Sequence, residues 1–294
     1  MVQRFGIVGY GVVGSLFARL LRQHGACVIS CDILLDREDT ATALRRRILA
    51  DGGEVGTFDE VLGSSDYILS VTPPQSCREV AARASRALRT GQVYCDLAST
   101  SPAAKKEMAA ESGANGAHFV EGVILGAVNG THSSPAILLG GVEAERTAAA
   151  LQKNGLRARF YSPEIGQASA FKMIRSVFSK GMEALLIETL VAARRADLFD
   201  DVWQEIKATL AVNPVEKTLE NWIRSHAISS GRRYCEMQEV GEFLSEIGLA
   251  PVMAHATADV FRRSNELEMS MRFPEEPERF EDVIEYLERG APLQ

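Results

Sequence analysis

The sequence predicts an α/β fold in which a doubly wound parallel sheet is followed by an all-helical C-terminal domain. Two observations lead to this prediction. The first 160 or so residues alternate short apolar runs with amphipathic helical stretches, a pattern typical of a parallel sheet covered by helices. From Gly166 onward the apolar residues follow a helical repeat, with no convincing strand pattern.

The first half contains seven apolar runs that we expect to be strands: residues 4–9, 27–32, 67–72, 92–96, 118–122, 136–141 and 157–161. The second half is expected to contain helices at 166–196, 200–211, 214–228, 233–248, 251–271 and 277–289. The change of pattern at "SPEIG" predicts a boundary near residue 163. It separates a domain of residues 1–163 from a domain of residues 164–294, and a long helix joins the two.

Composition narrows the functional classes. The chain has 294 residues, a net charge of −7 and 46% hydrophobic residues, which is ordinary for a soluble globular protein. The acidic balance argues against nucleic acid as the main partner. No apolar run approaches the roughly 20 residues of a membrane span, and the N-terminus enters a strand without a signal peptide. We therefore expect a cytoplasmic protein that binds neither membrane nor nucleic acid.

Cysteines and histidines give no indication of a metal site. The five cysteines lack metal-ligand spacing and are expected to be free, mostly buried thiols. The histidines are scattered along the chain, so we expect no catalytic metal.

The N-terminal run "GIVGYGVVG" has GxGxxG spacing, directly after an apolar strand and at the start of a helix. Its first glycine permits a tight turn, its second lets a diphosphate approach the backbone, and its third lets helix and strand pack closely. Free N–H groups at the helix start attract the anion. We therefore expect a Rossmann-type dinucleotide-binding domain. The expected cofactor contacts in this turn are Gly9, Tyr10, Gly11, Val12, Val13 and Gly14.

Asp32 bears on the choice of cofactor. It ends the second strand, 18 residues after Gly14, where a carboxylate can accept hydrogen bonds from the adenosine ribose. A carboxylate there repels a 2′-phosphate, so NAD is favoured over NADP. Arg37 is close enough in sequence to soften that preference, and NADP stays possible.

The segment "GQASAFKMIRSVFSKG" (166–181) carries a lysine in apolar surroundings. Helical spacing places one polar stripe on it: Ser169, Lys172, Ser176, Ser179 and Glu183. The rest of the circumference is mostly apolar, so we expect the helix to be buried. Burial lowers the pKa of a lysine from about 10.4 towards the range of a useful acid–base. The alternative is a lysine that snorkels or pairs with Glu183.

Four segments in this order give the chain a resemblance to a known superfamily: the glycine turn, "DLASTSP" (96–102), "VEGVILGAVNGT" (120–131) and "GQASAFKMIRS" (166–176). The chain resembles the β-hydroxyacid dehydrogenases, which include 3-hydroxyisobutyrate, tartronate semialdehyde and 6-phosphogluconate dehydrogenases. Its helical half is most similar to the subgroup with a phosphogluconate-dehydrogenase-like C-terminal domain. The resemblance implies hydride transfer between NAD(P) and a small to medium hydroxy acid, with Lys172 as general acid–base. It also implies a homodimer.

The same resemblance implies further site residues. Thr72 and Pro73 of "SVTPP", together with Ser99, would lie at the nicotinamide end of the cofactor. Substrate contacts would come from Ser99, Thr100, Gly126 and Ser176.

The chain departs from the superfamily pattern at the substrate positions. Ala98, Leu125 and Ala127 stand where polar residues or glycine are usual, and Ser176 replaces an asparagine. Polar contacts are thus missing or shortened. We expect a substrate that is bulkier or more apolar than a three- or four-carbon hydroxy acid.

Several functions remain open at this point. One is oxidative decarboxylation of the 6-phosphogluconate type, and another is a non-catalytic NAD(P)-binding sensor. Imine reduction is less favoured, because imine reductases on this scaffold generally replace the lysine. The cationic cluster of His226, Arg232 and Arg233 is either an anion anchor or a solvated helix face.

Overall fold

The structure is a computed structural model that describes residues 2–112, 115–126, 134–212 and 214–290. The chain forms two compact units, Met1–Val177 and Phe178–Gln294. The predicted boundary at residue 163 lies ahead of the helix that runs from the first unit into the second. No helix among the described residues is both long and apolar enough to cross a membrane.

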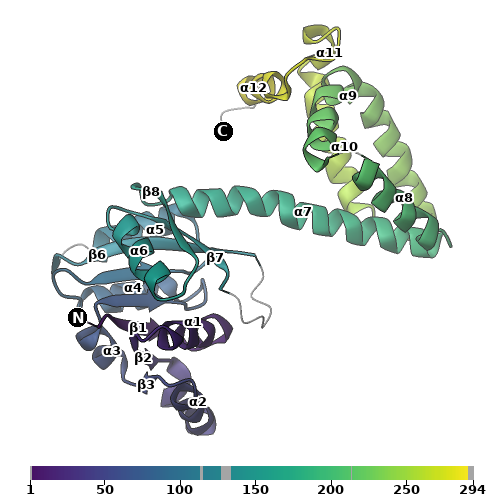
Figure 1. Cartoon of the computed structure of the whole chain (residues 1–294). Coiled ribbons are helices and arrows are strands. Elements are labelled where there is room, and N and C mark those ends of the chain that lie inside the picture. The colour runs from purple at the N-terminus through teal and green to yellow at the C-terminus, as the bar shows by residue number, and fades with distance from the viewer. Residues whose placement is uncertain (1, 113–114, 127–133, 213, 291–294) are drawn as a thin grey trace. The chain divides into compact units, whose positions relative to one another are not determined.

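Within the described residues, the first unit contains one sheet of eight strands. They are β1 (Arg4–Val8), β2 (Cys27–Cys31), β3 (Glu54–Val55), β4 (Tyr67–Ser70), β5 (Val93–Asp96), β6 (His118–Leu125), β7 (Ala136–Gly140) and β8 (Ala158–Ser162). Their order is β3-β2-β1-β4-β5-β6-β7-β8, as the labels in Figure 1 allow the reader to follow. The order reverses between β1 and β4, which confirms the doubly wound topology.

The sheet differs from the prediction in two places. β7 runs antiparallel to β6, because the ten residues between Leu125 and Ala136 are too few for a crossover connection. β3 is only two residues long and was not predicted, since so short a segment shows no apolar alternation.

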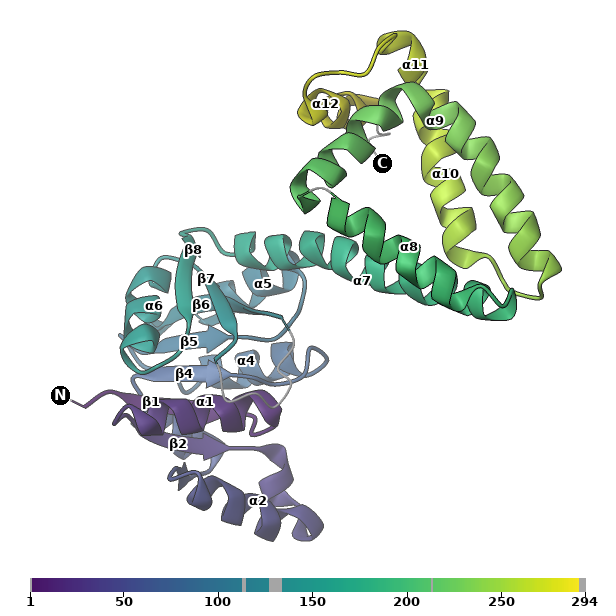
Figure 2. The ribbon, with the colours of Figure 1, turned by 45° about the vertical axis from the view of Figure 1, so that its right-hand side comes forward.

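Helices cover both faces of the sheet (Figure 2). One buried cluster joins the strands to α1 (Val12–Gln23), α2 (Glu38–Ala50) and α6 (Ala144–Lys153). The other joins them to α3 (Phe58–Ser64), α4 (Cys77–Ser85) and α5 (Pro102–Ser112). Neighbouring strand residues alternate between the clusters: Ile7 packs in the first and Val8 in the second. The sheet is therefore buried on both faces, as its apolar strands predict.

The described part of the second half is helical. Its elements are α7 (Gln167–Arg195), α8 (Phe199–Val212), α9 (Val215–Glu246), α10 (Val252–Glu266), α11 (Met269–Arg272) and α12 (Phe280–Gly290). These helices together confirm the prediction that the second half of the chain is all-helical.

The separate helices predicted at 214–228 and 233–248 are wrong, because α9 is continuous. A Cβ atom on Gly231 would lie 2.9 Å from Asn265 Oδ1, and one on Gly241 would lie 2.9 Å from His255 Nε2. These glycines therefore let α9 and α10 approach closely. A glycine inside a helix costs about 1 kcal/mol, which such packing offsets.

The single helix predicted at 251–271 is also wrong. α10 ends at Glu266, and Glu268 adopts a left-handed backbone with φ 54° before α11 begins. The sequence shows neither glycine nor proline at this point, so the break had no local signal.

The prediction that α7 is buried on nearly every side is wrong for the single chain. Ala168 and Phe171 in its first turns pack against Val123 and Leu138 of the sheet. Further along, Ile174 is 73% exposed and neighbouring apolar side chains are similarly open. The sheet covers only one side of the helix start.

Candidate active site

The glycine turn lies at the point where the strand order reverses. Val8 at the end of β1 pairs with Ser70 at the end of β4, and open α/β sheets bind ligands at this place. A Cβ atom on Gly14 would lie 2.0 Å from the carbonyl oxygen of Gly9, so the fold itself requires that glycine. Gly9, with φ 96°, takes a conformation that favours glycine. A Cβ atom on Gly11 would meet no atom within 4 Å. The space before α1 is therefore open, as a cofactor diphosphate needs.

Asp32 ties the end of β2 to this turn. Its carboxylate accepts hydrogen bonds from the N–H of Tyr10 (2.6 Å) and of Leu34 (2.9 Å). Each carboxylate oxygen keeps a further lone pair. Asp32 thus fits the role of acceptor for the ribose hydroxyls of a bound dinucleotide.

Tyr10 turns its side chain away from the open space. The ring is buried, its hydroxyl donates to Asp51 (2.9 Å), and its carbonyl oxygen accepts from Arg47. Burial and the hydrogen bond to Asp51 raise the pKa of the Tyr10 hydroxyl well above its ordinary value. The side chain of Tyr10 is therefore not available to a cofactor.

The other proposed cofactor contacts have mixed exposure. Val12 is exposed at the start of α1, whereas Val13 is half-buried against the core. The Thr72 and Ser70 hydroxyl oxygens lie 3.4 Å apart, and Pro73 is exposed just after β4.

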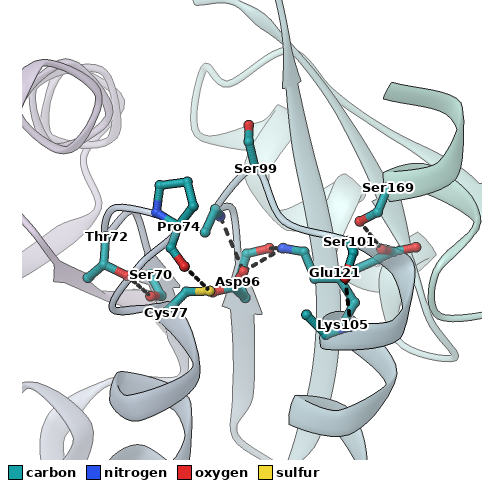
Figure 3. A network of polar contacts seen from close by, with 12 residues as sticks. Ser70, Thr72, Pro74, Cys77, Asp96, Ser99, Ser101, Lys105, Glu121 and Ser169 are labelled. Carbon is teal, nitrogen blue, oxygen red and sulfur yellow. Dashed lines mark hydrogen bonds and ion pairs between the residues drawn. The ribbon is translucent and has the colours of Figure 1, made fainter. Parts of the chain in front are cut away.

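A buried ion pair shapes the loop after β5. Asp96 and Lys105 both have fully buried side chains. The Lys105 ammonium donates to the Asp96 carboxylate and to the Asp96 carbonyl oxygen (2.8 Å), as Figure 3 shows. The N–H of Ala98 also donates to the carboxylate (3.2 Å). Burial raises the pKa of Asp96, and the Lys105 ammonium opposes that shift. These contacts fix the backbone that leads to Ser99.

Ser99 and Lys172 meet although they are 73 residues apart. The Lys172 ammonium, on the half-buried side of α7, donates a hydrogen bond to the hydroxyl oxygen of exposed Ser99. Ser176 donates its hydroxyl to the carbonyl oxygen of Lys172 (2.8 Å). Of the predicted substrate residues, Thr100 is half-buried beside Ser99, and Gly126 is exposed with φ 85°.

The residues at the positions that depart from the superfamily pattern bring few polar groups to the candidate substrate site. Ala98 is buried, and Leu125 is half-buried against the cluster that also holds Ala168. Ala127 lies outside the described residues.

Glu121 was missed by the sequence analysis. Its fully buried carboxylate accepts hydrogen bonds from the N–H groups of Gly166 (2.7 Å) and Ala168 (2.9 Å) and from the Ser169 hydroxyl (2.5 Å). The signal that could have identified it is a carboxylate within the apolar run "HFVEGVIL".

The cations of the helical unit are engaged locally. The His226 ring packs against Phe261, and burial together with Arg233 lowers the pKa of His226. Arg233 donates to the Ser225 hydroxyl (2.9 Å), and Arg232 pairs with Glu236. The described residues contain no group of three or more His, Cys, Asp or Glu that could hold a metal ion.

Comparison with known families agrees with the glycine turn and the sheet. The model for the NAD-binding domain of 6-phosphogluconate dehydrogenase matches residues 4–158. The chain belongs to this family. A second model, for a domain of unknown function, matches residues 193–264 of the helical half. The predicted family and the dinucleotide cofactor are thereby confirmed.

Similar proteins cover nearly the whole chain. The conserved protein MTH1747 is 27% identical with a TM-score of 0.60, over 98% of this chain and 100% of its own, and is described as similar to 3-hydroxyacid dehydrogenases. An uncharacterized 28.5 kDa protein from Methanothermus fervidus is 24% identical, over 90% of this chain and 99% of its own. An imine reductase variant from Myxococcus stipitatus, solved with NAD⁺, is 18% identical with a TM-score of 0.76, over 98% of this chain and 100% of its own. That reductase shares the fold.

We predict that Gly11→Val weakens cofactor binding without unfolding the protein. The new side chain enters open space, so it disturbs no protein atom, yet it fills the volume that a diphosphate needs. NADH titrated by fluorescence should bind at least about tenfold more weakly, a loss of about 1.4 kcal/mol. Gly63→Val on α3, where a Cβ atom also meets no neighbour, is the matched control. Unchanged NADH affinity in Gly11→Val would contradict the assignment.

We predict that Lys105→Met destabilises the first unit by about 3–5 kcal/mol, because it leaves the buried Asp96 carboxylate without its ammonium. The folded-state pKa of Asp96, which burial already raises, then rises further because the opposing ammonium is gone. The loss is therefore small in acid and grows as pH rises through the unfolded-state and folded-state pKa values of Asp96. Urea unfolding across pH measures this. Adding Asp96→Asn should restore part of the stability, and a pH-independent loss would contradict the argument.

Proposed function

We propose that the protein is an NAD(P)-dependent oxidoreductase that moves a hydride between nicotinamide and the CH–OH group of a small to medium hydroxy acid. Lys172 is the general acid–base. The observation that carries the proposal is the hydrogen bond between Lys172 and Ser99. Ser99 follows Asp96 on β5, and Asp96 pairs with Ser70 on β4, next to the point where the strand order reverses. The Lys172 amine, through Ser99, and the glycine turn are thus both near the carboxyl ends of the parallel strands.

The chemistry assigned to these residues is a proton transfer coupled to hydride transfer. When bound, the nicotinamide would supply the acceptor for the hydride of the alcohol. The neutral Lys172 amine would take up the hydroxyl proton. In the reverse direction the Lys172 ammonium returns the proton to the carbonyl oxygen. The Ser99 hydroxyl accepts from Lys172 and keeps its own proton to donate to the substrate oxygen, which orients the substrate.

The surroundings of Asp32 support NAD as the preferred cofactor. Its carboxylate is held at the turn by two backbone N–H groups. The guanidinium of Arg37 lies 3.4 Å from the Asp39 carboxylate and forms an exposed ion pair with it, so Asp39 partly neutralises its charge. A 2′-phosphate would therefore meet negative charge.

The apolar character of Ala98 and Leu125 supports a substrate less polar than the smallest hydroxy acids. A hydroxy acid with a longer or branched side chain would find apolar contacts there, and backbone N–H groups near Ser99 could receive its carboxylate.

We predict that Lys172→Ala lowers kcat at least about 10²-fold while NADH affinity stays unchanged, because a general acid–base contributes on this scale. The assay follows NADH and NADPH absorbance with hydroxy acids of graded size, and with imines in the reductive direction. Lys180→Ala, which removes an exposed lysine of the same helix, is the control. Equal turnover in wild type and Lys172→Ala would remove Lys172 from the mechanism.

The same screen separates the alternatives. Release of CO₂ would identify an oxidative decarboxylase of the 6-phosphogluconate type. Tight cofactor binding without turnover of any compound would favour a sensor. Highest efficiency with the smallest, most polar acids would contradict the proposed substrate class.

We also propose that two copies of the chain associate through their helices. Apolar side chains on α7 are widely exposed in the single chain, with Ile174 73%, Val177 76% and Ile187 59% exposed. Large apolar side chains exposed in this number along one helix indicate an interaction site.

We predict a dimer in sedimentation velocity, and a monomer for the double variant Ile174→Glu with Ile187→Glu, because unpaired charges at these two apolar positions could not be buried by a second copy. Leu49→Glu on α2, where the leucine is 61% exposed, is the control and should stay dimeric. A monomeric wild type at micromolar concentration would contradict the proposal.

A further inference from the structure

We propose that Glu121 is the positioning residue for Lys172. Its buried carboxylate holds the first turn of α7 and thereby sets where the Lys172 ammonium lies relative to Ser99. The inference rests on the proposed function, because it assigns Glu121 a role through the acid–base lysine.

The contacts of Glu121 are those of a helix anchor. Oε1 accepts the N–H groups of Gly166 and Ala168, and Oε2 accepts the Ser169 hydroxyl. N–H groups in the first turn of a helix have no partner within the helix. A carboxylate satisfies them and complements the positive end of the helix dipole. Hydrogen bonds to an ionised acceptor are roughly twice as strong as neutral ones. Figure 3 shows Ser169 directed at this carboxylate.

The anchor lies one helical turn from the amine. Ser169 and Lys172 are three residues apart, so they share one side of α7. A helix is stiff over a single turn, and a shift of its start therefore moves the lysine. The Ser169 hydroxyl, which the sequence places on the same stripe as the lysine, thus belongs to the anchor.

The neighbouring strand leaves room for the carboxylate. A Cβ atom on Gly140 of β7 would lie 2.7 Å from Oε1 of Glu121, closer than real Cβ contacts. Gly166, whose N–H reaches Glu121, has φ 103°, a conformation that favours glycine. Both glycines serve the same hydrogen-bonded arrangement.

Two adjacent carboxylates hold the two halves of the Ser99–Lys172 contact. Asp96, at the end of β5, is the register partner of Glu121, in the middle of β6. Asp96, with Lys105, fixes the loop of Ser99, and Glu121 fixes the helix of Lys172. The hydrogen bond between Ser99 and Lys172 therefore joins a loop fixed by Asp96 to a helix fixed by Glu121.

The experiment is a double-mutant cycle with Glu121→Gln and Lys172→Ala, assayed on the best substrate of the screen. Glutamine keeps the size of the side chain but turns a donor towards the donors of α7. In the wild-type background kcat should fall on the order of 10²-fold, because small misplacement of a catalytic group costs this much. The KM for cofactor should stay unchanged. In the Lys172→Ala background the same substitution should cost nothing further.

Two variants complete the design. Ser169→Ala removes one of the three hydrogen bonds and leaves the carboxylate in place, so it should lower kcat by a smaller factor, and it provides the test if Glu121→Gln does not fold. Glu164→Gln removes an exposed carboxylate near the same helix start and should match the wild type.

Full activity in folded Glu121→Gln and in Ser169→Ala would overturn the inference, as would an equal loss with and without Lys172. Loss of activity in Lys172→Ala with none in these variants would overturn the positioning role and leave the proposed function standing. An unaffected Lys172→Ala would overturn both.

Discussion

The shared register of four parallel strands is the constraint on which the rest of the structure depends. Val8, Ser70 and Asp96 end β1, β4 and β5 and are successive register partners, and Asp96 pairs in turn with Glu121 in the middle of β6. The glycine turn follows the first of these strands, and the loop with Ser99 follows the third. A slip of one residue in any of these strands would turn each side chain to the opposite face of the sheet. Backbone pairing therefore brings distant segments together before any catalytic side chain is considered.

Two carboxylates in that row are fully buried, and each needs its own compensation. An ionised carboxylate in an apolar interior costs several kcal/mol unless donors replace its lost hydration. Asp96 receives an ammonium and a backbone N–H, whereas Glu121 receives two backbone N–H groups and a hydroxyl. The backbone donor to Asp96 lies next to Ser99 in the chain. The donors to Glu121 lie at the start of the helix that carries Lys172. The hydrogen bonds that compensate the buried carboxylates therefore also fix the segments that carry Ser99 and Lys172.

The sequence allowed prediction of features that depend on local chemistry. The glycine turn was predictable because strand, glycine spacing and helix are contiguous, and the fold class followed from the periodicity. The continuity of α9 was not, because it depends on how closely α10 approaches Gly231 and Gly241. The role of Glu121 was not predictable either, since its three donors lie more than forty residues away. Contacts between residues that are distant in the sequence produce no motif of fixed spacing.

The exposure of α7 in the single chain and its apolar sequence are consistent only if something else covers it. Burying the side chains of Ile174, Val177 and Ile187 would contribute about 1.5–3 kcal/mol each. Apolar side chains gain no stabilisation while they are exposed to water, so a second apolar surface is the simplest source of cover, and the same helix of a second copy would supply one. For the proposed acid–base role of Lys172, a copy packed there would also shield the half-buried lysine from water. The proposed proton chemistry and the proposed association of chains would then both depend on the same apolar helix.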